Sequence, residues 1–311
     1  MAYGSRYNDR PKYPETDGKL MDIYRHFECW DDLLEMADKT PETKGGCSSH
    51  ASTESWAGTN SFEGAMKLAR EGWPEGRKKI LNLKDKLKDD FFNKMKKVDI
   101  QWDVVGEQVD VGRFIEGVPE CMAIFNVKEG MGKGIVTIAL NIAASANVNT
   151  SVITRRGAAA LTIVDVLEDM GFRCEVRFGE AVRPSGYGTR QNDFYETGTI
   201  LKHAPQAVDL DTLAFGLAHP SMLRRIIFSV QENESAAIRA RFGFNAEMGG
   251  YGYPAELKKL DNVDLLFPHI DYREEAKFNS DDKTVDWITK ELNKVLSESE
   301  SDARVAKNES C

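Results

Sequence analysis

The stretch from residue 134 to residue 178 constrains the fold of this chain more than any other part. Residues 134–145 form an apolar run that ends in small and polar residues, residues 155–171 have helical spacing, and residues 174–178 alternate like a short strand. This order predicts a right-handed βαβ unit, in which the two strands are parallel neighbours. We therefore expect an α/β fold with a mostly parallel sheet flanked by helices.

Other strands of this sheet are expected on both sides of the βαβ unit. Residues 121–127 and 134–142 are separated by a glycine-rich turn, so we predict that they pair as a hairpin. Further strands are predicted at residues 195–201, 222–230 and 263–267. Residues 284–296 have the amphipathic spacing of a closing helix.

The two halves of the chain differ in pattern, which predicts how the domains are organised. Helical spacing predicts a helical region over residues 19–97. An Asp- and Gly-rich segment with period-two spacing predicts an irregular connector with one or two short strands over residues 98–120. The α/β domain is expected to span residues 121–297. Residues 1–18 and 298–311 are polar and aperiodic, which predicts disorder at both ends.

Composition excludes some classes of protein. No apolar run in the 311 residues approaches the about 18 to 20 residues of a membrane-spanning helix. The first ten residues have no apolar core after their charges, which argues against a signal peptide. The five cysteines are scattered without C-x-x-C spacing, which predicts reduced thiols rather than a metal site. We therefore expect a cytoplasmic protein without a membrane anchor.

Catalytic and cofactor motifs give little support for an enzyme. Gly130–Gly134 differs from a phosphate-binding loop, because Val127 stands where the first glycine belongs and Gly134 replaces the hydroxyl that binds Mg²⁺. No G-x-S-x-G motif marks a catalytic serine. We therefore expect no cofactor and no catalytic residues, although an enzyme with an unrecognised site stays an alternative.

The end of the central predicted strand resembles a known metal site. Asn141-Ile-Ala-Ala-Ser145 resembles the D-x-S-x-S end of the first strand in von Willebrand factor A domains, where the Asp and the hydroxyls hold a divalent cation. Asn141 stands at the Asp position, Ala143 at the first Ser position, and only Ser145 matches. The resemblance covers roughly residues 134–297 and implies Rossmann-type layering with a degenerate site that holds no metal.

Four short sequence segments resemble those of an uncharacterised family of bacteriophage and mobile-element proteins. The segments that carry this resemblance are Ser61–Ala65, Gly72–Gly76, Asp110–Cys121 and Arg156–Ala159. The resemblance implies a phage origin and a location in the cytoplasm of the infected host cell.

The segment 242–253 predicts a surface for a protein partner beside the carboxyl edge of the sheet. Its glycines let the backbone bend, and exposed aromatic side chains concentrate binding energy. A loop that folds back over the sheet is the alternative interpretation of the same residues. The predicted contact residues are Arg155, Arg156, Phe242, Phe244, Tyr251 and Tyr253. We expect a non-catalytic interaction or assembly protein that binds a phage or host protein. The von Willebrand A resemblance makes a ring-shaped ATPase one candidate partner.

A lysine-rich segment suggests a different function. The segment from Arg77 to Lys97 contains nine Lys or Arg residues and three Asp residues, although the formal net charge of the whole chain is −9. Such a helix could neutralise phosphates, so a nucleic-acid-binding accessory factor is an alternative. Its candidate contacts are Lys78, Lys79, Lys84, Lys86, Lys88, Lys94, Lys96 and Lys97.

Overall fold

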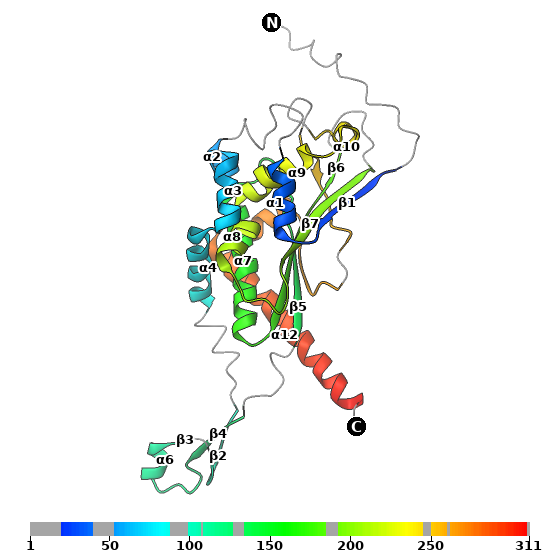
Figure 1. Cartoon of the computed structure of the whole chain (residues 1–311). Coiled ribbons are helices and arrows are strands. Elements are labelled where there is room, and N and C mark those ends of the chain that lie inside the picture. Colours follow the sequence, from blue (N-terminus) through cyan, green and yellow to red (C-terminus); the bar gives the residue numbers. More distant parts are fainter. Residues whose placement is uncertain are drawn as a thin grey trace.

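The expected α/β class is confirmed by a computed structural model of the chain. The structure describes residues 20–39, 53–87, 99–106, 108–126, 134–184, 192–244, 250–259 and 262–309. A mixed six-stranded sheet packs against helices, and a small three-stranded sheet lies beyond one end of this main body (Figure 1). Among the described residues, no helix is both long and apolar enough to cross a bilayer.

The main sheet has the strand order β1–β7–β6–β5–β9, with β8 paired to β6. Its strands are β1 (Asp22–Phe27), β5 (Ile135–Asn141), β6 (Arg173–Arg183), β7 (Phe194–Lys202), β8 (Tyr253–Pro254) and β9 (Leu265–Phe267). Strand β5 is parallel to both β6 and β9, and β1 is parallel to β7. Strand β6 runs antiparallel to β7 and β8.

The predicted βαβ unit is confirmed as β5, α7 (Thr150–Asp169) and β6. The two strands pair in parallel from Ile135 opposite Arg173 to Asn141 opposite Gly179. Helix α7 begins after Asn149, whose side chain accepts a hydrogen bond from the Ser151 amide. Almost all of β5 is buried, which explains its continuous apolar run.

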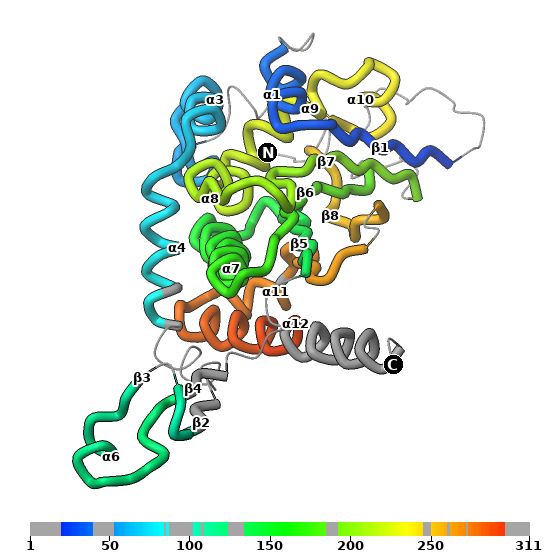
Figure 2. Tube along the Cα trace, turned by 60° about the horizontal axis from the view of Figure 1, so that its bottom comes forward, coloured from blue at the N-terminus to red at the C-terminus, as the bar shows by residue number. Residues whose placement is uncertain are grey.

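Helices surround the sheet and supply most of its apolar core. They are α1 (Trp30–Asp38), α2 (Glu54–Ala57), α3 (Phe62–Glu71), α4 (Pro74–Leu87), α8 (Leu210–Ala218), a π-helix (Met222–Ile227), α9 (Phe228–Glu232), α10 (Ala236–Phe242), α11 (Tyr272–Lys277) and α12 (Asp281–Glu309). Helices α4, α7 and α8 contact one another on one side of the sheet (Figure 2).

The prediction of a strand over residues 222–230 is wrong, because this segment forms the π-helix and the first part of α9. Every residue of the segment is buried, and it packs against α1, α3 and α8. A continuous apolar run fits a helix buried on all sides as well as a central strand, so periodicity alone does not separate the two.

The predicted hairpin between residues 121–127 and 134–142 is also wrong. Strand β4 (Met122–Asn126) instead pairs antiparallel with β2 (Asp99–Asp103) and β3 (Gln108–Val109), outside the main sheet. Together with α6 (Val111–Ile115) these strands form the small sheet unit. Most of the predicted connector is therefore ordered, and the Asp110 side chain caps α6 by accepting from the Arg113 amide.

The N-terminal region is not helical throughout, because residues 22–27 form the edge strand β1. This strand is held to β7 by side chains as well as by the ladder, since the Thr197 and Thr199 hydroxyls donate to the carbonyls of Arg25 and Phe27. At the other end of the chain, α12 continues to Glu309, where the sequence predicted a disordered tail. Residues 1–18 lie outside the described residues.

Candidate functional site

A cavity of about 530 Å³ lies at the carboxyl ends of β5 and β6, which we call the strand-tip cavity. Parallel sheets present their ligand sites at this edge. The cavity is lined by Trp56, Ala143, Ala144, Ser145, Ala146, Asn147, Glu180, Val182, Leu223, Arg224, Phe228, Gly250, Tyr251, Gly252, Tyr253 and Pro254. Segments that are far apart in the sequence therefore meet at the edge where the sequence predicted a site.

Asn141 and Ser145, the two residues of the predicted degenerate metal site, have different roles. Asn141 is fully buried, and its amide donates to the Ala255 carbonyl at 2.7 Å and accepts from the Ala143 amide at 3.1 Å. Its side chain thus fixes the backbone at the end of β5, whereas Ser145 is exposed and lines the cavity. The described residues contain no group of three or more His, Cys, Asp or Glu side chains that could hold a metal ion.

Glu180 is a buried acid in the wall of the cavity. It is 1% exposed, and both carboxyl oxygens accept from the Gln231 amide, at 3.0 and 3.1 Å. Within the described part of the chain no cation pairs with it. Burial raises the pKa of the Glu180 carboxyl to about 8, with a further rise from the charge of Glu196. The group is therefore mostly protonated at neutral pH.

Arg224 brings a cation to the same cavity. Its side chain is 1% exposed and donates to the main-chain carbonyls of Trp56, at 2.5 Å, and Val148, at 2.8 Å. The guanidinium carbon lies 4.5 Å from the centre of the Trp56 ring. Burial lowers the pKa of Arg224 to about 10, so the group still carries a positive charge at neutral pH. No carboxylate pairs with it among the described residues.

Aromatic rings form another wall of the cavity. Phe228 and Tyr251 stack with their ring centres 3.7 Å apart and their planes 4° apart. The Tyr251 hydroxyl donates to Glu232 of α9, which fixes the ring. Gly252 has a φ of 92°, and a Cβ there would lie 2.7 Å from the Val182 side chain, so the segment needs glycine to follow β6 this closely. Tyr253, at 63% exposure, lies at the rim.

The predicted contact residues Arg155 and Arg156 do not line the cavity. Arg155 donates to Asp281 at 3.2 Å and to the Phe278 carbonyl at 3.0 Å. Arg156 is buried and donates to the Pro268 carbonyl. Both arginines therefore attach α7 to the C-terminal segment, because the helix turns these positions away from the strand tips.

The predicted contact residues Phe242 and Phe244 are not exposed. Both are fully buried, with ring centres 5.8 and 5.0 Å from the ring of Tyr195. They form a small apolar cluster with Tyr195 and Val182, separate from the main core. Tyr251 is also mostly buried, so Tyr253 is the one predicted aromatic contact that is exposed. Residues 245–249 of the same segment lie outside the described residues.

The lysine-rich segment is described only in part. Lys78 and Lys79 are exposed on α4, and the Lys79 ammonium lies 5.2 Å from the centre of the Trp73 ring. Lys86 forms an ion pair with Asp281 at 2.7 Å. The side chain of Lys84, and Lys88, Lys94, Lys96 and Lys97 as a whole, lie outside the described residues. Nucleic-acid binding stays a prediction.

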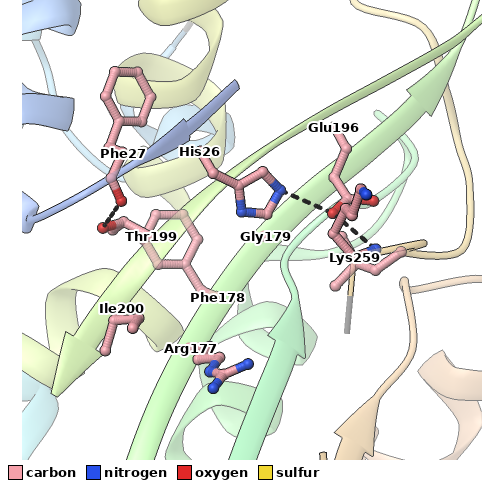
Figure 3. A pocket seen from close by; sticks show the side chains of 10 residues that line it. His26, Phe27, Arg177, Phe178, Gly179, Glu196, Thr199, Ile200 and Lys259 are labelled. Carbon is pink, nitrogen blue, oxygen red and sulfur yellow. Dashed lines mark hydrogen bonds and ion pairs between the residues drawn. The ribbon is translucent and has the colours of Figure 1, made fainter. Parts of the chain in front are cut away.

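A second pocket, of about 300 Å³, lies on the face of the sheet between β1, β6 and β7. Figure 3 shows His26 and Glu196 pointing toward each other there, with the imidazole Nε2 2.9 Å from the carboxylate. Glu196 is fully buried and also accepts from the Lys258 amide at 2.7 Å. Gly179 lines the pocket and is the register partner of Gly198 in β7. The buried carboxylate thus orients the imidazole.

Sequence reasoning missed the two charged residues of the strand-tip cavity. Glu180 lies just beyond the strand predicted at residues 174–178, and Arg224 lies in a segment predicted to be a strand. The available signal was a pair of arginines, Arg224 and Arg225, inside an otherwise apolar run. A charge at such a position is buried and needs polar partners, which points to a special environment.

Comparisons with known proteins identify a family. The family model described as a domain of unknown function, DUF7192, matches residues 15–295, which is most of the chain. Neither the search of curated proteins nor the search of solved structures found a match. The matched range includes both pockets and every strand of the two sheets. The chain belongs to the DUF7192 family.

Proposed function

We propose that this protein is a non-catalytic interaction or assembly protein that binds a protein partner at the strand-tip cavity. The observation that carries the proposal is the cavity itself, which lies at the carboxyl edge of the parallel strands and has apolar and aromatic walls. A cavity of this size accommodates a large side chain of a partner, and buried pockets with aromatic walls are where interfaces concentrate binding energy.

The residues at the rim of the cavity favour a binding site for a protein partner over an active site for a substrate. Ser145, Ala146 and Asn147 are exposed on one side, and Tyr253 is exposed on the other. Among the described residues, the Ser145 hydroxyl has no hydrogen bond to a general base, so no activated nucleophile stands at the cavity. An exposed tyrosine beside an apolar pocket suits a partner that covers the rim while it inserts one side chain.

The biological setting of this proposal comes from the sequence resemblance. A phage origin, the cytoplasm of the infected host cell and a von Willebrand A-like character are parts of the proposal. The last of these is supported by the β5–α7–β6 unit with Asn141 and Ser145 at the carboxyl end of β5. The partner class that the resemblance implies is a ring-shaped ATPase.

A pair of matched substitutions tests the proposal. Ala146→Trp fills the mouth of the cavity, and Ala207→Trp places the same ring on an exposed residue between β7 and α8. We expect a partner captured by the wild-type protein, and identified by mass spectrometry, to be retained by Ala207→Trp and lost by Ala146→Trp. Both variants should keep the wild-type melting temperature. Equal capture by the two variants would show that partners bind elsewhere.

A further inference from the structure

We infer that the strand-tip cavity recognises a carboxylate carried on an apolar group, with Arg224 as the cation that binds it. The inference rests on the proposed function, because it names the chemistry of the side chain that enters the same cavity. It is carried by geometry, since one cavity contains a buried guanidinium and a buried carboxyl group that have no partner of opposite charge among the described residues.

In the part of the chain that the structure describes, no carboxylate neutralises the positive charge of Arg224. The side chain is held by two main-chain carbonyls and by the Trp56 ring, which orient the guanidinium but do not cancel its charge. These two hydrogen bonds use only part of the donors of the guanidinium, so it can donate to a ligand as well. A planar carboxylate matches the arrangement of these donors.

Glu180, the neighbouring acid, does not neutralise the positive charge of Arg224 at neutral pH. Because the Glu180 carboxyl has a pKa of about 8, it is mostly neutral and does not offset Arg224. The apolar walls, which include Val182, Leu223 and Phe228, strengthen the attraction between the guanidinium and an anion. A ligand with one negative charge balances this site, whereas a dianionic phosphate would bring an excess charge into an apolar environment.

Burial, the largest influence on Glu180, and the charge of Glu196 raise its pKa and favour the neutral form, whereas the hydrogen bonds from Gln231 lower its pKa. Glu196 from β7 contributes a negative charge, and Glu232 from α9 is bonded to the Tyr251 hydroxyl. Gln231 donates to the carboxyl group but carries no charge. As the pH rises above about 8, Glu180 ionises and repels a bound carboxylate. The affinity for the carboxylate should therefore fall with rising pH.

Small probes test this inference on the full chain. Sodium benzoate carries a carboxylate on an apolar ring, and benzamide is its neutral counterpart of nearly the same shape. We expect ligand-observed NMR titrations at about pH 7 to show benzoate binding at least about tenfold more tightly than benzamide. Arg224→Gln should abolish this preference. Since Arg224→Gln could impair folding, the pH profile of Glu180→Gln provides a second test.

The pH profile separates Glu180 from the other titratable groups. We expect benzoate affinity to fall about tenfold between about pH 7 and about pH 9.5 in the wild-type protein, with no such fall in Glu180→Gln. Equal affinity for benzoate and benzamide would overturn the inference, as would tighter binding of inorganic phosphate or an equal fall with pH in both proteins. Partner capture that depends on Ala146 without any benzoate binding would retain the proposed function and overturn this inference. Benzoate binding without capture of any partner that depends on Ala146 would retain this inference and overturn the proposed function.

Discussion

Glu180 differs in its partner from three other buried acids of the main body. Glu234 accepts two hydrogen bonds from Arg25, Asp193 pairs with Arg241, and Glu196 bonds to His26. Glu180 accepts only from a neutral amide. An acid without a cation is costly to ionise inside a protein, so this residue links the stability of the fold to pH.

The first prediction concerns the stability of Glu180→Gln. The pKa of Glu180 rises from an ordinary value of 4.5 to about 8 on folding, so the folded state binds more protons than the unfolded chain between these values. The wild-type protein should therefore lose free energy of unfolding as the pH rises through this interval. Glu180→Gln lacks this loss and should be more stable than wild type by on the order of a few kcal/mol at about pH 8.

Urea unfolding at about pH 5 and about pH 8 measures this difference. Glu116→Gln, which changes an exposed glutamate of the small sheet unit in the same way, is the matched control and should follow the wild-type curve. If the difference in stability between Glu180→Gln and wild type does not grow with pH, the Glu180 carboxyl does not titrate as the structure implies.

The amino-acid sequence predicted only some of the residues of the strand-tip cavity. The sequence placed Ser145, Tyr251 and Tyr253 near the carboxyl edge, because the end of a predicted strand and a glycine-rich segment are local signals. It could not assign Arg156, Phe242 and Phe244 to the interior, or Arg155 to its contacts with the C-terminal segment, since these positions depend on contacts with distant segments. Glu180 and Arg224 were missed for the same reason.

Helices α7 and α8 pack closely against each other at a glycine. Gly157 of α7 lies against the end of α8, where an added Cβ would come within 2.2 Å of the Leu217 carbonyl oxygen and 2.3 Å of the Ala218 Cα. The two helices approach at this point because one of them has no side chain there. The contact holds α7, and with it the βαβ unit, against the helical layer.

The second prediction compares two helical glycines. Gly157→Ala should lower the free energy of unfolding by about 2–3 kcal/mol, because backbone atoms of α8 cannot move aside as a flexible side chain would. Gly64→Ala in α3 meets its nearest atom, the Ser61 hydroxyl oxygen, at 3.4 Å, so it should raise stability by up to about 1 kcal/mol through helix propensity. Chemical denaturation of both variants measures the two effects. Equal effects at the two positions would mean that α7 and α8 are not packed as described.

Local patterns predicted one supersecondary unit correctly, the βαβ unit, and another wrongly, the hairpin between residues 121–127 and 134–142. The β5–α7–β6 unit was predictable because two strands and a crossover helix follow one another in the chain. The segment 222–230 was not, because its burial between several helices removes the periodicity that separates strand from helix. Strand β1 was missed because its partner β7 lies far along the chain.

The whole molecule consists of a large main body and the small sheet unit. Figures 1 and 2 show that unit beyond one end of the main body. Among the described residues, the hydrogen bonds of β2, β3, β4 and α6 stay within the unit. Val105 and Ile115 of the unit are 74% and 77% exposed. The main body therefore does not depend on the small sheet unit for its core.

The third prediction removes this unit. Replacing residues 98–127 with a short Gly-Ser linker should shift the melting temperature of the main body by less than about 2 °C, which corresponds to less than about 1 kcal/mol. Deleting residues 20–28, which contain β1, is the contrasting variant and should lower it strongly because the edge of β7 loses its ladder. Differential scanning calorimetry compares the two. A large loss in the first variant would show that the unit supports the main body.

The pairing of β1 with β7 also sets the order in which this chain can fold during synthesis. The two strands are joined by contacts between residues 172 positions apart. At translation rates of about 5–20 residues per second, the first strand leaves the ribosome roughly ten to thirty seconds before its partner exists. During that interval the nascent N-terminal segment has no place in the sheet, so chaperones that shield emerging chains have their longest opportunity to act there.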